Sequence, residues 1–135
     1  MATSEIATIA VVDPDLTNCM LVREIALASG WVVAGFAHST ADGLGLLERT
    51  APLCLVTDYR FDGDETGLHL IARAKRLLPD LFTVILTGWD INDVAAHVGR
   101  HAPDRILRKP IAPHVLMEFL NGVHMRVDQI RIDAV

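Results

Sequence analysis

Short apolar segments alternate with amphipathic ones along the chain, and this alternation restricts the fold more than any other feature of the sequence. Five runs rich in Ile, Val, Leu and Phe are predicted to be strands, at residues 6–12, 31–37, 53–57, 82–86 and 105–108. Each is followed by a segment with apolar residues at helical spacing, at residues 21–28, 41–49, 70–78, 91–98 and 113–127. This order predicts an α/β fold, a doubly wound sheet of five parallel strands flanked by five helices.

Glycine and proline mark several of the predicted helix ends. Gly30 is expected to end the first helix, and Pro79 follows the third. Pro113 suits the first turn of the last helix, where a missing backbone N–H costs nothing. The second helix is predicted to be weak, because it contains both Gly43 and Gly45.

Size and composition narrow the class of protein. A chain of 135 residues with 51% hydrophobic residues suits one domain with a proper core, expected to span residues 1–135 with its core at about 6–127. The net charge of −5 argues against binding nucleic acid through its phosphates.

No apolar run approaches the ~20 residues of a membrane span, and residues 1–5 lack the basic patch of a secretory signal. Cys19 and Cys54 are expected to be buried, reduced thiols of a cytoplasmic protein.

Polar residues stand at the carboxyl ends of the predicted strands. Asp13 and Asp15 follow the first strand, Asp58 the third, Thr87 the fourth and Lys109 the fifth. In a parallel sheet these ends share one edge, where ligands bind. Carboxylate oxygens suit Mg²⁺, and a cation with a nearby hydroxyl suits a phosphoryl group. An aspartate can also act as the nucleophile and form an acyl phosphate.

Four segments that carry these residues resemble the receiver domain of two-component response regulators. They are Ile9–Asp13, Leu55–Asp58, Val84–Gly88 and Leu107–Pro110. The resemblance implies a flavodoxin-like sheet with strand order 2-1-3-4-5. It also implies a signalling protein that assists only its own phosphorylation and dephosphorylation and is otherwise not an enzyme.

The resemblance assigns roles to individual residues. Asp58 would accept the phosphoryl group from a phosphohistidine on a sensor histidine kinase or a histidine phosphotransfer protein. Thr87 would donate a hydrogen bond to the phosphoryl group, and Lys109, held by a cis bond to Pro110, would pair first with the carboxylate and then with the phosphoryl oxygens. The implied Mg²⁺ ligands are Asp13, Asp15, Asp58 and the backbone carbonyl of Arg60.

Two positions depart from the pattern of the family. Pro14 stands where the family has a second acid, so either Asp15 takes over as a ligand, directly or through water, or metal binding is weaker or lost. Asp15 is also a suitable helix cap. Ile106 stands where the family has Tyr or Phe, so the usual aromatic ring that responds to the threonine is missing.

The loop after Asp58 also differs from the family, and it is about one residue longer. In it, the Arg60 side chain has two alternative roles, a contact with the phosphoryl group or an ion pair with Asp62 or Asp64. Trp89, two residues after Thr87, is a further aromatic without an assigned role.

Three functions remain open from the sequence. The first is a stand-alone receiver that signals by binding an unknown target protein, with no nucleic acid or membrane involved and with a homodimer left open. The second is a pseudo-receiver that binds its partner without phosphorylation. The third is a haloacid-dehalogenase-type phosphatase, because Asp13-Pro14-Asp15-Leu16-Thr17 matches the opening motif of that class, with Asp13 as nucleophile.

Overall fold

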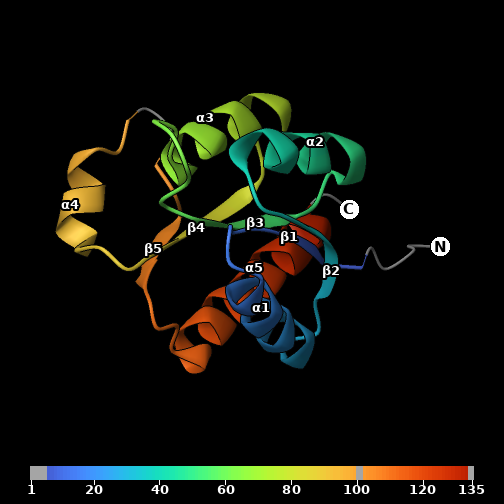
Figure 1. Cartoon of the computed structure of the whole chain (residues 1–135). Helices are drawn as coiled ribbons and strands as arrows, with labels where there is room; N and C mark the ends of the chain where they lie inside the picture. Colours follow the sequence, from blue (N-terminus) through green and yellow to red (C-terminus); the bar gives the residue numbers. More distant parts are fainter. Residues whose placement is uncertain (1–5, 100–101, 134–135) are drawn as a thin grey trace.

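One parallel sheet organises the chain, whose computed structural model describes residues 6–99 and 102–133. Its strands lie in the order β2-β1-β3-β4-β5 (Figure 1), which confirms the predicted topology. The strands are β1 (Thr8–Val12), β2 (Val32–Ala37), β3 (Cys54–Asp58), β4 (Phe82–Thr87) and β5 (Arg105–Arg108).

Helices cover both faces of this sheet. Figure 1 shows α1 and α5 on one face, α2 and α3 on the other, and α4 beside β5 at one end. The helices are α1 (Leu16–Ala28), α2 (Thr40–Thr50), α3 (Gly67–Leu77), α4 (Ile91–Ala96) and α5 (Pro113–Asp133). In the described part of the chain no helix has the length and apolar character needed to cross a membrane.

Two apolar cores sit on the two faces of the sheet. Ile9 and Val11 of β1 pack into the core beneath α1 and α5, with Trp31, Leu116 and Leu120. Ala10 and Val12 of the same strand pack into the opposite core, together with residues of α2 and α3. Because successive strand side chains point to opposite faces, a strand covered on both sides must be apolar throughout, as the sequence runs are.

The second helix is longer than the sequence predicts. It extends from Thr40 to Thr50 and begins at the N-cap Ser39, whose side chain accepts a hydrogen bond from the Asp42 amide. Gly43 is needed for close packing, since a Cβ atom there would lie 3.0 Å from both γ-carbons of Val12. The glycine that weakens the isolated helix therefore lets α2 approach β1, and tertiary packing offsets its low propensity.

Other helix ends differ from prediction by a few residues. α1 begins at Leu16, ahead of the apolar positions at residues 21–28 that predict it, because Asp15 caps it and accepts a hydrogen bond from the Thr17 amide. α4 ends at Ala96, two residues before the predicted end, and α5 continues past Val127 to Asp133.

The two cysteines are free and buried, as expected. Burial, aided by the negative charge of Asp13, raises the pKa of the Cys19 thiol to about 11. Burial also raises the pKa of Cys54. At pH 8 a thiol with the pKa of Cys19 is thiolate in only about one molecule in a thousand, and the thiolate is the reactive form.

We therefore expect both thiols of the native protein to react with iodoacetamide at pH 8 at least about fiftyfold more slowly than in 8 M urea. Counting alkylated thiols by mass spectrometry over time measures this. Equal rates in the native and unfolded protein would contradict the buried placement of both residues.

Candidate functional site

The carboxyl ends of β1, β3, β4 and β5 meet at one edge of the sheet and bring the predicted site residues together. The register pairs Val12 with Thr57, Asp58 with Leu86 and Thr87 with Arg108. Asp13 and Lys109 directly follow their strands, so they emerge at the same edge. The side chains at this edge are therefore fixed by strand pairing and not by a flexible loop.

Lys109 lies between two of the carboxylates. Its Nζ atom is 3.0 Å from Asp13 Oδ2 and 3.0 Å from Asp58 Oδ1. Its backbone is held as well, because the Lys109 amide donates to the Thr87 carbonyl and the Lys109–Pro110 bond is cis, as the resemblance implied. Asp13 is only 2% exposed, and a buried carboxylate of this kind requires a partner such as this ammonium group.

The charges at the site influence one another. Burial has the largest effect on Asp58 and raises the pKa of its carboxyl, the charge of Asp13 raises it further, and the hydrogen bond from Lys109 opposes both. For Lys109, burial lowers the pKa, but hydrogen bonds to Asp58 and Asp13 outweigh burial and raise the pKa above its ordinary value. Lys109 is therefore a permanent positive charge between the two acids at neutral pH.

The two oxygens of Asp58 have different surroundings. Oδ1 accepts a hydrogen bond from the Tyr59 amide at 2.9 Å and forms an ion pair with Lys109 Nζ at 3.0 Å. Within residues 6–99 and 102–133 no donor reaches Oδ2, and the side chain retains 14% of its exposure. One oxygen thus holds the carboxylate in place, and the other is available to react.

Thr87 is completely buried at the end of β4. Its Oγ1 atom accepts a hydrogen bond from the Trp89 amide at 2.9 Å. A hydroxyl that accepts one hydrogen bond still has its own hydrogen to donate. Thr87 therefore retains the hydrogen that the donor role implied by the resemblance requires.

The structure gives Asp15 a definite local role. Its Oδ1 atom caps α1, and its amide donates to Asp13 Oδ1 at 2.8 Å. The capping alternative is therefore confirmed for Asp15, and among residues 6–99 and 102–133 no donor reaches its Oδ2 atom. Pro14, between the two acids, is exposed and supplies no side-chain oxygen.

The donors at this edge fit a Mg²⁺ ion with few protein ligands. In the described part of the chain no three His, Cys, Asp or Glu residues converge on one point. Mg²⁺ typically takes one or two carboxylates and keeps several waters, and Asp13 and Asp58 supply two. The Arg60 carbonyl accepts no hydrogen bond from the described residues, so it is a third available oxygen.

The loop after Asp58 is anchored at several points that the sequence did not reveal. Gly67 donates its amide to the Tyr59 carbonyl, and Thr66 and His69 form a capping box at the start of α3. Glu65 accepts a hydrogen bond from Thr40 of α2 at 2.6 Å and pairs with Arg73 at 2.6 Å. Hydrogen bonds from Arg73 and Thr40 hold the pKa of Glu65 below its ordinary value.

The Arg60 side chain does not form the ion pair that was one of its two expected roles, and its contact with a phosphoryl group stays a prediction. Among the described residues it pairs with no carboxylate, so the expected ion pair with Asp62 or Asp64 is absent there. Its guanidinium carbon instead lies 4.5 Å from the centre of the Trp89 ring. Ile106 is half-buried and packs against the core on the α2 and α3 side.

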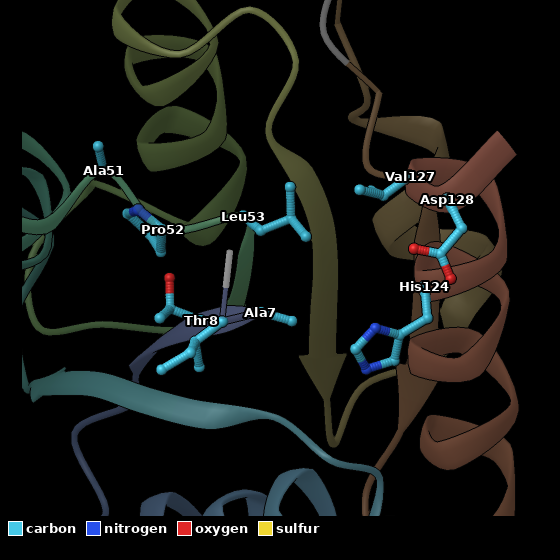
Figure 2. A pocket seen from close by; sticks show the side chains of 9 residues that line it. Ala7, Thr8, Ala51, Pro52, Leu53, His124, Val127 and Asp128 are labelled. Atoms are coloured by element: carbon cyan, nitrogen blue, oxygen red, sulfur yellow. The ribbon is translucent and has the colours of Figure 1, made fainter. Parts of the chain in front are cut away.

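A separate hollow lies at the opposite edge of the sheet, where the strands begin. It has a volume of about 380 Å³, and Figure 2 shows it between Pro52 and Leu53 on one side and His124 and Asp128 of α5 on the other. None of the predicted site residues lines it. The candidate site is therefore distinguished by its charged groups and not by the size of a cavity.

Comparison with known proteins points to one family. The family model described as "Response regulator receiver domain" matches residues 9–121. Comparison with curated proteins gave no match.

Solved structures show the same fold. The receiver domain of AraT, a response regulator from Geobacillus stearothermophilus, is 23% identical, with a TM-score of 0.83 over 94% of this chain and 99% of that one. A response regulator receiver domain protein from Clostridium thermocellum is 23% identical, with a TM-score of 0.80 over 93% of this chain and 99% of that one. A CheY-like receiver domain protein from Methanospirillum hungatei is 21% identical, with a TM-score of 0.77 over 90% of this chain and 99% of that one.

Proposed function

Since the chain belongs to the response regulator receiver domain family, we propose that it accepts a phosphoryl group on Asp58 and transmits the change by binding another protein. The observation that carries this proposal is the position of Lys109, 3.0 Å from Asp58 and 3.0 Å from Asp13. This arrangement places a positive charge beside the reacting carboxylate. The same charge is then available to a phosphoryl group.

The proposed donor is a phosphohistidine on a sensor histidine kinase or a histidine phosphotransfer protein. Asp58 Oδ2, which no described residue occupies, attacks the phosphorus atom in line with the histidine nitrogen. A phosphorus–oxygen bond forms and the phosphorus–nitrogen bond breaks. The imidazole leaves with the electron pair and takes up a proton from solvent.

Lys109 and Thr87 act on the product. Lys109 hydrogen-bonds a phosphoryl oxygen and offsets the added negative charge. The Thr87 hydroxyl donates to a second oxygen. The Trp89 amide, which donates a hydrogen bond to Thr87 Oγ1 in the unmodified protein, moves with Thr87. We propose that this displacement of the loop after β4 is what a downstream protein detects.

A Mg²⁺ ion fits the same oxygens. Asp13, Asp58 and the Arg60 carbonyl would hold it directly, and Asp15 Oδ2 is available to it through water. When bound, the ion would reduce the repulsion between the carboxylate and the incoming phosphoryl group.

Labelling with acetyl phosphate tests the proposal. In the presence of millimolar Mg²⁺ we expect the protein to gain the mass of one phosphoryl group, and we expect excess EDTA to lower the rate at least about tenfold. Intact-protein mass spectrometry over time measures both rates. Absence of any labelling with Mg²⁺ would contradict the proposed function.

One observation favours the pseudo-receiver as a second candidate. Pro14 supplies no carboxylate at the position next to Asp13, and one carboxylate oxygen of Asp15 is already used to cap α1. On that account neither acetyl phosphate nor a phosphorylated donor labels the protein, and Mg²⁺ leaves the fluorescence of Trp89 unchanged. The labelling experiment therefore separates the two candidates.

A further inference from the structure

Arg60 and Trp89 connect the two loops that border the site. Arg60 lies two residues after Asp58, and Trp89 lies two residues after Thr87. The Arg60 guanidinium carbon is 4.5 Å from the centre of the Trp89 ring and 5.9 Å from that of Tyr59. A cation over an aromatic face is attracted by the ring, so this contact holds the loop after β3 to the loop after β4.

The surroundings of the contact leave both groups accessible. Arg60 is exposed, and Trp89 is 52% exposed although it is a large apolar side chain. A hollow of about 240 Å³ lies beside them and is lined further by Tyr59, Asp93, Val94 and His97. Within the described residues no carboxylate lies within ion-pair distance of Arg60, so an aromatic ring takes the place of an anion.

A phosphoryl group on Asp58 would give the Arg60 guanidinium an anionic partner. Guanidinium groups form paired, charge-assisted hydrogen bonds with phosphate oxygens, and such bonds are stronger than a cation–π contact at an exposed site. Asp58 is the last residue of β3 and Arg60 follows it by two residues, so the new anion forms at the start of the loop that carries Arg60. The guanidinium then has a better partner than the ring.

We propose that Arg60 is a phosphoryl-responsive latch, which rests on Trp89 in the unmodified protein and moves to the phosphoryl oxygens when Asp58 is modified. The inference rests on the proposed function and adds a regulatory contact to it. Release uncovers the Trp89 face as part of the surface that a partner protein meets. It also frees the loop after β4 from the loop after β3. Trp89 would then supply a responsive aromatic ring near the site, since Ile106 stands where the family has Tyr or Phe.

Tryptophan fluorescence tests the latch, because the two tryptophans differ in exposure. Trp31 is 1% exposed and Trp89 is 52% exposed, so acrylamide quenches Trp89 selectively. We expect beryllofluoride with Mg²⁺, which imitates the phosphoryl group, to raise the acrylamide quenching constant about twofold, since the ring loses its cover. In Arg60→Met the constant should already be high, and beryllofluoride should leave it unchanged. Arg23→Met, on the exposed side of α1, is the matched control and should behave like the wild type.

Labelling of the same samples with acetyl phosphate separates the two hypotheses. If the wild type is labelled but beryllofluoride leaves its quenching constant unchanged, the latch is wrong and the proposed function stands. A low quenching constant in Arg60→Met, or a beryllofluoride response that survives in that variant, also overturns the latch. If the wild type takes no label, the proposed function and the latch fail together.

Discussion

Asp58→Asn is expected to lower phosphoryl incorporation from acetyl phosphate by more than about a hundredfold. The amide nitrogen replaces Oδ2, the oxygen to which no described residue hydrogen-bonds, and an amide does not attack phosphorus as a carboxylate does. The remaining amide oxygen still accepts from the Tyr59 amide and from Lys109, so the local structure is preserved. Intact-protein mass spectrometry measures the labelled fraction over time.

Asp62→Asn provides the matched control for this substitution. Asp62 is an exposed acid in the same loop, and the change removes the same charge. We expect its labelling rate to stay within about twofold of the wild type, since exposed charges in high dielectric interact weakly. Labelling of Asp58→Asn at the wild-type rate would show that another residue is the acceptor.

Gly67→Ala is expected to lower the free energy of unfolding by about 3 kcal/mol, because overpacking against a fixed backbone is costly. A Cβ atom at residue 67 would lie 2.3 Å from the Asp58 carbonyl oxygen and 3.0 Å from Ile85 Cδ1. The carbonyl cannot retreat easily, because Asp58 is paired with Leu86 in the sheet. Urea unfolding followed by circular dichroism measures the change.

Gly122→Ala makes the same change in α5 and should act in the opposite direction. Among the residues that the structure describes, no atom lies within 4 Å of a Cβ built there, apart from the chain neighbours and the nearby backbone of α5 itself. Alanine favours the helix interior over glycine, so we expect a gain of about 0.5–1 kcal/mol. If Gly67→Ala were as stable as the wild type, the close approach of α3 to the end of β3 would be wrong.

The sequence predicted the positions of the site residues well, for a physical reason. Asp13, Asp58, Thr87 and Lys109 each stand at the end of an apolar run, and strand pairing in a parallel sheet leaves such ends at one edge. The strand order and the cis bond before Pro110 followed from the resemblance to the family, and the structure has both. Their chemical roles remain predictions that the labelling experiments address.

Contacts between loops that lie far apart in the sequence could not be predicted in the same way. The position of Arg60 on Trp89 depends on how two loops leave neighbouring strands, and neither residue belongs to a periodic pattern. Gly67 resembles any glycine in a polar loop until the Asp58 carbonyl is seen beside it. Asp15 was recognisable as a helix N-cap, because aspartate directly before a helix can accept a hydrogen bond from a backbone amide of its first turn. The sequence could not show whether Asp15 caps the helix or binds the metal.

The position of the phosphoryl group itself tests the central claim most directly. Borohydride reduces an aspartyl phosphate to homoserine, and peptide mass spectrometry of the labelled, reduced protein locates the converted residue. We predict homoserine at residue 58 alone. Homoserine at residue 13 would contradict the account and support the phosphatase alternative, in which Asp13 is the nucleophile.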